Sequence, residues 1–200
     1  MNKKFKLLII FSILSLSIIY IYDSSVKNTL SISNYFPSEY VTLIYDYTNH
    51  DYNEEISQSV QYIYENKVQI HQVSSKAEFT KIYEVSDKEI KLIFMNENKD
   101  INKNFLHEKS NINRIILRAP SILNKTWKTD KAKYKITNTN VSISTPHNNY
   151  NCIEVTAFYD FGEEQIYFAP NIGIVKSITN FYTNDDKYIL ELKQIEYNNK

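Results

Sequence analysis

The amino-acid sequence predicts an all-β fold, an antiparallel meander that forms one strongly curved sheet or an open barrel. In segment after segment, apolar residues recur at every second position, which is the period of a strand with one buried face. The 200 residues include 17 Tyr and 10 Phe but only 2 Gly, so strand formers dominate and Asn, Asp, Ser and Lys must form most turns. Long helical periodicities do not intervene, which argues against a βαβ architecture.

The first half of the predicted domain contains two hairpins. The alternation marks strands at residues 60–64, 68–70, 79–85 and 90–94, with turns at Asn66 and at Ser86-Asp87. Residues 96–111 lose the alternation and are strongly polar, so they predict a long connection with a helical turn near residues 104–108.

The second half repeats this rhythm after a short apolar strand at residues 114–118. That strand ends at Pro120, because proline cannot donate a hydrogen bond to a ladder. Further strands are predicted at residues 134–136, 141–143, 153–157, 166–168, 174–182 and 188–192, with turns at Pro146, Phe161-Gly162, Pro170 and residues 184–186.

The N-terminus carries an export signal. Lys3, Lys4 and Lys6 precede the uncharged apolar run of residues 7–22, and this order predicts a hydrophobic helix whose C-terminal side crosses the membrane. As a helix the run reaches about 24 Å, which is short of a hydrocarbon core of about 30 Å and favours cleavage. No small-residue cleavage site follows it, however, which favours an uncleaved anchor. Cleavage near Ser25 or later is the alternative.

The sequence therefore predicts a signal peptide or signal anchor at residues 1–22, a polar stalk at residues 23–39, and one extracytoplasmic β domain at residues 40–200. The expected location is the cell membrane, as a single-pass protein, or the medium if residues 1–22 are removed. Three of the 23 basic residues precede the apolar run, which leaves 20 against 23 acidic residues in the exported part. No polybasic arm is present, so nucleic acid is not an expected partner.

Residues capable of chemistry are scattered, and the sequence predicts no catalytic, cofactor-binding or metal site. Ser24 and Lys27 match an S-x-x-K pattern within the stalk, without the partner motifs that give it meaning. The histidines are His50, His71, His107 and His147; His71 is expected on a solvated strand face and the others in turns or loops. The densest polar cluster contains Asp46, His50, Asp51, Glu54 and Glu55, and we expect a polar hairpin loop there.

Cys152 is the one thiol of the chain, and it begins an apolar strand with no basic neighbour to lower its pKa. We expect a small, partly buried strand residue, with a reactive or dimer-forming thiol as the alternative. The many Tyr residues could stack on carbohydrate, but most occupy the inward phase of strands, which favours core packing.

A set of motifs in the second half resembles an uncharacterised family of secreted proteins and lipoproteins of Gram-positive bacteria. The matching residues are Leu117-Arg118-Ala119-Pro120, Trp127, Ser144-Thr145-Pro146, Tyr150-Asn151-Cys152-Ile153-Glu154-Val155 and the run from Tyr167 to Lys176. The resemblance covers roughly residues 40–183 and implies a β-rich extracytoplasmic domain of unknown function. The chain departs from the pattern at His147-Asn148-Asn149, where a Gly-containing turn is usual, and it has no lipobox Cys, which argues against lipid anchoring.

Physically, these motif residues are structural. Gly173 supplies a backbone geometry that other residues resist, Pro170 ends a strand, and Trp127 anchors the core. The expected function is therefore a non-enzymatic surface domain that binds a protein, glycan or lipid ligand or has a structural role. The alternative is a carrier that encloses a lipid or other hydrophobic ligand within its curved sheet.

Overall fold

The computed structural model of the chain describes residues 30–97, 102–183 and 186–198, and it confirms the all-β fold class. Chain contacts separate Met1–Leu30 from the compact unit Ser31–Lys200. Within the described part of this unit, one short 3-10 helix precedes twelve strands: η1 (Ile32–Tyr35), β1 (Val41–Thr48), β2 (Asn53–Tyr64), β3 (Lys67–Val73), β4 (Glu78–Val85), β5 (Glu89–Glu97), β6 (Arg114–Arg118), β7 (Thr126–Lys128), β8 (Lys133–Ser144), β9 (Asn149–Tyr159), β10 (Gly162–Ala169), β11 (Gly173–Phe181) and β12 (Lys187–Tyr197).

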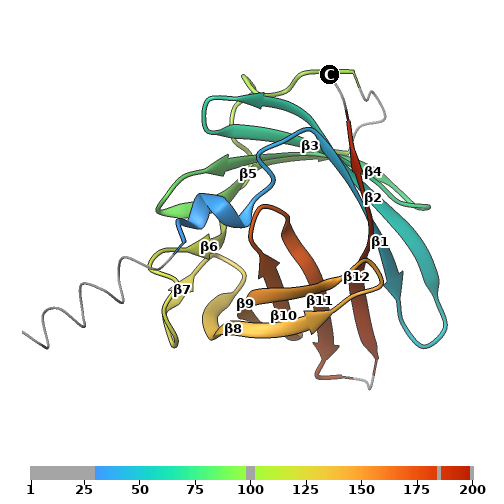
Figure 1. Cartoon of the computed structure of the whole chain (residues 1–200), viewed down its shortest axis with the longest axis vertical. Helices are drawn as coiled ribbons and strands as arrows, with labels where there is room; N and C mark the ends of the chain where they lie inside the picture. The colour runs from blue at the N-terminus through green and yellow to red at the C-terminus, as the bar shows by residue number, and fades with distance from the viewer. Residues whose placement is uncertain (1–29, 98–101, 184–185, 199–200) are drawn as a thin grey trace, which may run out of the picture. The chain divides into compact units, whose positions relative to one another are not determined.

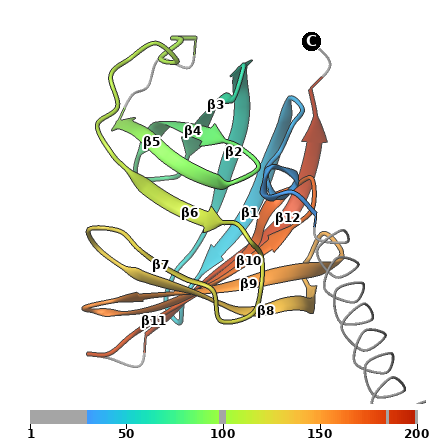
Figure 2. The ribbon, with the colours of Figure 1, turned by 90° about the vertical axis from the view of Figure 1, so that its left-hand side faces the viewer.

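All twelve strands belong to one antiparallel sheet, in the order β6-β5-β4-β3-β2-β1-β12-β11-β10-β9-β8-β7. Each strand therefore pairs with its sequence neighbour except at two places: β1 also pairs with β12, and β6 is followed by β7 at the opposite end of the order. Register shifts interrupt several ladders, for example between Ile44 and Tyr45 where β1 meets β12. Such bulges increase local bending and twist, and the sheet curves around a common interior (Figures 1 and 2).

The two end strands of the sheet are joined by a side chain. The indole Nε1–H of Trp127 in β7 donates a hydrogen bond of 3.0 Å to the carbonyl oxygen of Ile115 in β6. Trp127 is buried, and its ring stacks on Tyr134 of β8 with centroids 5.4 Å apart. The predicted role of Trp127 in the core is confirmed, and the contact brings the two ends of the sheet together into a nearly closed barrel.

Residues 31–37 enter one end of the concave interior, and we call them the plug. Ile32, Tyr35 and Phe36 are buried among core residues of the sheet, and the backbone N–H of Asn171 donates a hydrogen bond to the carbonyl oxygen of Asn34. The expected polar stalk at residues 23–39 thus differs from the structure over its second half, because three large apolar side chains drive that half into the core. Residues 23–29 lie outside the described part.

Gly173 begins β11 directly beneath the plug. Its φ is +95°, a conformation that L side chains rarely adopt, as the sequence analysis predicted. A Cβ at this position would lie 3.4 Å from Pro37 Cδ and 3.5 Å from the carbonyl oxygen of Tyr35. Glycine therefore meets a backbone requirement and leaves room for the plug.

The connection after β5 covers the outer face of β3–β5 and forms a second small core. Phe105 and Leu106 are buried there against Ile82 and Phe94, and the Gln69 side chain bonds to the backbone of Lys103 and Phe105. His71 lies on the same outer face of β3 and is 2% exposed. The expectation that His71 is solvated is therefore wrong. The Nε2 atom of His71 lies 3.3 Å from a Glu78 carboxylate oxygen.

The hydrophobic helix predicted at residues 7–22 lies outside the described residues. Among the residues that are described, no helix is long and apolar enough to cross a membrane.

Substitution of Trp127 tests the closure of the sheet. Truncation to Ala removes a buried aromatic ring and should lower the free energy of unfolding by about 3–5 kcal/mol. Trp127→Phe keeps most of the packing but leaves the Ile115 carbonyl without its donor, and should cost about 1–3 kcal/mol. Urea unfolding followed by circular dichroism measures both, and equal stability of Trp127→Phe and wild type would show that the indole hydrogen bond is not needed.

Candidate functional site

The concave interior changes character from one end to the other. Along β1, the inward residues Val41, Leu43 and Tyr45 are buried, whereas Tyr47 at the far end of the strand is half-buried. The same gradient follows β11, where the inward residues are buried near the plug and Thr179 is half-buried. The interior is therefore closed at the plug end and accessible at the opposite end, which we call the mouth.

Two cations face the interior near the mouth. Lys81 shares the inward face of β4 with Tyr83, and Arg114 shares the inward face of β6 with Ile116; Tyr83 and Ile116 both line the small apolar cavity beneath the plug. Lys81 Nζ donates a hydrogen bond of 2.8 Å to Gln72 Oε1. Burial, with the charge of Arg114 acting in the same direction, lowers the pKa of Lys81 to about 8.

One carboxylate shares this interior. Glu164 projects from β10 on the inward face, and the Tyr159 hydroxyl donates a hydrogen bond of 3.2 Å to its Oε2. Burial raises the pKa of Glu164, although the hydroxyls of Tyr159 and Ser177 and the charges of Arg114 and Lys81 oppose the rise. Within the described residues, neither Lys81 nor Arg114 forms an ion pair with Glu164 at 4.0 Å or less, so the three charges interact without direct contact.

A continuous row of rings borders the mouth on the side of β1 and β9–β12, and we call it the aromatic rim. Neighbouring centroids are 5.0–5.7 Å apart, and the rings are Tyr47, Tyr188, Phe181, Phe161 and Tyr159. Phe161 is 52% exposed. Because Tyr159 also bonds to Glu164, the rim is connected to the charged interior.

A cleft of about 570 Å³ opens at the mouth where the two end strands of the sheet approach each other. Residues 110–114 form one wall and residues 129–131 the other. Arg114 lines this cleft and also interacts electrostatically with Lys81 and Glu164. Arg114 is therefore shared by the cleft and the charged interior. Most residues that line the cleft are polar or charged, so the cleft is suited to holding a polar or charged group.

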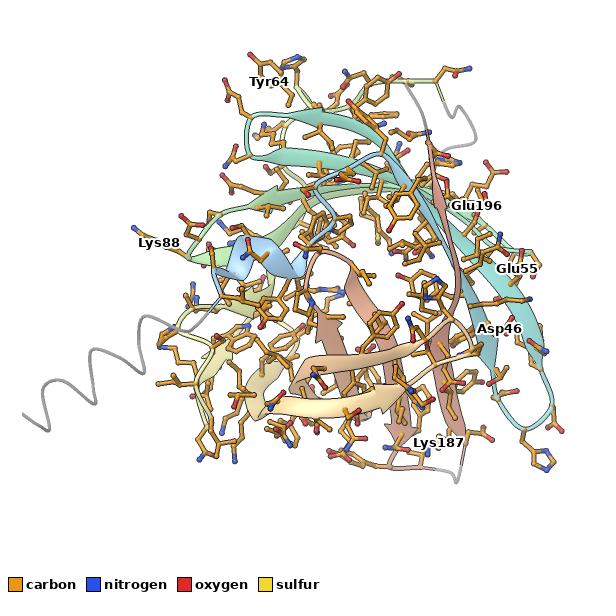
Figure 3. All side chains as sticks on the ribbon, in the orientation of Figure 1. Asp46, Glu55, Tyr64, Lys88, Lys187 and Glu196 are labelled. Carbon is orange, nitrogen blue, oxygen red and sulfur yellow. The ribbon has the colours of Figure 1, made fainter. Side chains whose placement is uncertain are left out.

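The acidic cluster expected near residue 50 is not assembled into a site. Asp46 and Glu55 lie on the outer side of β1 and β2 (Figure 3), where Lys193 Nζ is 3.1 Å from a carboxylate oxygen of each. Glu54 accepts hydrogen bonds from Ser75. Among the described residues, no three His, Cys, Asp or Glu side chains gather where they could hold a metal ion.

The remaining residues considered in the sequence do not line the cleft. His50 and His147 occupy turns, and His107 lies in the covering connection, as expected. Cys152 is buried in β9, and burial raises its pKa to about 12. This environment fits the expected packing role and opposes thiolate chemistry. Ser24 and Lys27 lie outside the described residues.

Lys81, Arg114 and Glu164 were missed in the sequence analysis. Each stands two positions from an apolar residue of the inward phase: Tyr83, Ile116 and Ile166. A charged residue in an inward phase was therefore the signal that could have revealed them. Their meeting could not be foreseen, because it depends on how β4, β6 and β10 are arranged across the barrel.

Comparisons with known proteins establish the fold only. No family model matches the sequence, and no curated protein matches it. A protein from Bacteroides fragilis described as exported, with a YmcC-like fold, superposes with a TM-score of 0.55 at 15% identity over 80% of this chain and 98% of that chain. A protein from Parabacteroides distasonis described as a lipoprotein gives 0.53 at 12% identity, over 81% and 98%. The resemblance to a Gram-positive family stays a prediction.

The lowered pKa of Lys81 predicts a pH dependence of stability. Between pH about 8 and about 10, the unfolded chain keeps this proton and the folded chain releases it, so stability should rise with pH. We expect Lys81→Met to remove the rise. Urea unfolding at several pH values measures the effect in a Cys152→Ser background, because the raised pKa of Cys152 makes stability fall above pH about 9. Parallel pH profiles with and without the Lys81→Met substitution would contradict the assignment.

Proposed function

We propose that the protein is a non-enzymatic extracytoplasmic domain that binds a small ligand at the mouth of its curved sheet. The difference between the two ends of the interior carries this proposal. The plug fills one end, whereas the other end is half-buried and charged and shares Arg114 with a cleft of about 570 Å³. Ligand sites typically combine an apolar wall with a few convergent polar groups. The aromatic rim and the three charges supply that combination.

Several observations favour binding over catalysis. Catalysis by a nucleophile needs a reactive group beside a base, and the one thiol of the chain is buried with its pKa raised to about 12. The histidines occupy exposed turns, the covering connection and the outer face of β3, and none of them lines the cleft. Lys81 donates a hydrogen bond to Gln72, and Glu164 accepts one from Tyr159.

The plug provides a reason to keep a hydrophobic carrier as the second candidate. Beneath it lies an apolar cavity lined by residues such as Leu43, Ile70 and Phe168, but its free volume is about 30 Å³. That volume is comparable to one water molecule. Carriage of an acyl chain therefore requires the plug to leave, whereas binding at the mouth requires no such change.

The proposed location rests on residues 1–22 and on the solved proteins that share the fold of this chain. A Lys-flanked apolar run precedes the domain, and the two solved relatives in fold are described as an exported protein and a lipoprotein. The domain then acts outside the cytoplasm, attached to the membrane through residues 7–22 or released from it by cleavage.

Two dyes that share their rings test binding at the mouth. N-phenyl-1-naphthylamine is uncharged, and 1-anilinonaphthalene-8-sulfonate adds an anion to the same ring system. We expect saturable fluorescence enhancement with at least one dye and its loss in Thr179→Trp, because the new ring fills the mouth. The control is Asn180→Trp, which adds the same ring on the outer face of β11.

Absence of saturable binding by both dyes would contradict the proposed function. Equal binding of the uncharged dye to the wild type and to Thr179→Trp would instead favour the carrier, since its ligand would lie beneath the plug.

Protease treatment tests the proposed location. When protease is added to protoplasts or spheroplasts, residues 40–200 should be digested while cytoplasmic proteins stay intact. Before digestion the product should sediment with the membrane fraction if residues 7–22 are an anchor. Protection of the full-length chain would show that the domain does not cross the membrane, and release without residues 1–25 would replace the anchor with a cleaved signal.

A further inference from the structure

Two interior cations, Lys81 and Arg114, face one carboxylate, Glu164, whose charge favours the charged form of Lys81. The cleft beside Arg114 adds one further cation and one further carboxylate, Lys131 and Asp130, so the cations outnumber the carboxylates by one. The charge of Arg114 disfavours the charged form of Lys81, and Glu164 does not reach ion-pair distance of either within the described residues. No hydrogen bond or ion pair occupies the Arg114 guanidinium in the described part of the chain. Like charges in a half-buried space are unfavourable unless an opposite charge joins them.

Both cations also retain unused hydrogen-bond donors. An ammonium group has three donors and a guanidinium has five, whereas Lys81 donates one described hydrogen bond, to Gln72. Gln72 Oε1 also accepts a bond of 3.0 Å from Gln58, so this amide fixes the position of the ammonium group. A planar guanidinium and an ammonium group that interact electrostatically can together bind the oxygens of a carboxylate or phosphate.

The aromatic rim offers a second contact surface to a ligand whose anionic group binds the two cations. Tyr47, Tyr188 and Phe181 line the mouth on strands β1, β12 and β11, whereas Lys81 and Arg114 come from β4 and β6, which lie on the other side of β1 in the sheet order. A ligand that contacts both sides must present an oxyanion at one end and an apolar or ring-bearing body at the other.

We infer that the mouth binds an oxyanion, of the carboxylate or phosphate monoester type, that is carried on an apolar or ring-bearing body. This inference rests on the proposed function and adds the ligand class. Lys81 and Arg114 hold the anion, the aromatic rim holds the body, and Glu164 opposes the anion and excludes ligands with more negative charge than the two cations can balance.

Calorimetric titration of the full domain with phenyl phosphate, inorganic phosphate and phenol tests the inference. We expect phenyl phosphate to bind saturably, inorganic phosphate more weakly, and phenol weakest, which separates a free anion from an anion on a ring. Lys81→Met and Arg114→Gln should each weaken phenyl phosphate about tenfold or more, the size expected for loss of one charge-assisted contact. Glu164→Gln should strengthen it.

Lys88→Gln is the matched control, because Lys88 is an exposed lysine in the β4–β5 turn at the plug end (Figure 3), and it should bind phenyl phosphate as the wild type does. A readout on the wild type does not depend on the folding of any variant: phenyl phosphate should raise the melting temperature, and phenol at the same concentration should not. Release of phenol from phenyl phosphate would contradict the non-enzymatic part of the proposed function.

Two results would overturn the inference. One is phenyl phosphate affinity unchanged in folded Lys81→Met and Arg114→Gln proteins. The other is the absence of phenyl phosphate binding while the dyes bind at the mouth, in which case the proposed function survives and the oxyanion assignment fails. If neither the dyes nor phenyl phosphate bind, both the proposed function and the oxyanion assignment are wrong.

Discussion

The hydrogen bond from the Trp127 indole to the Ile115 carbonyl oxygen joins the two ends of a twelve-stranded sheet, and the rest of the interior depends on it. Unpaired edge strands expose backbone donors and acceptors and invite association with other chains. Here both end strands are short, with five residues in β6 and three in β7. The same tryptophan stacks on Tyr134, which interacts with Tyr159, and Tyr159 in turn donates a hydrogen bond to Glu164. Closure of the sheet is thereby coupled to the position of the charged interior.

The closed sheet creates one interior with two unlike ends. At the plug end, Tyr35 and Phe36 complete an apolar core, and Gly173 provides the backbone geometry and space that the plug needs. At the mouth, β4, β6 and β10 place charged side chains in positions that would otherwise hold apolar ones. Burying charges lowers stability unless a partner compensates for it. Two cations and one carboxylate at these positions therefore lower the stability of the domain, and this cost is consistent with the binding site proposed above.

Period-2 alternation was sufficient to predict the hairpins and the antiparallel sheet, because one face of most strands packs on the interior. It failed for His71, since the connection after β5 covers the face that alternation assigns to solvent. The plug was missed because Ile32, Tyr35 and Phe36 show no strand period and are surrounded by Ser and Asn. The site was missed for a different reason: single charged residues in three separate strands become neighbours only after the sheet closes.

Hydrogen exchange of the Trp127 indole measures the closure most directly. The chain contains one Trp, so its indole N–H gives a single resonance in a nitrogen-resolved NMR spectrum. If the bond to Ile115 holds the ends of the sheet together, this proton should exchange as slowly as the backbone amides of β9 and β10. Fast exchange, at the rate of a solvent-exposed indole and with the β9–β10 amides still protected, would contradict the account.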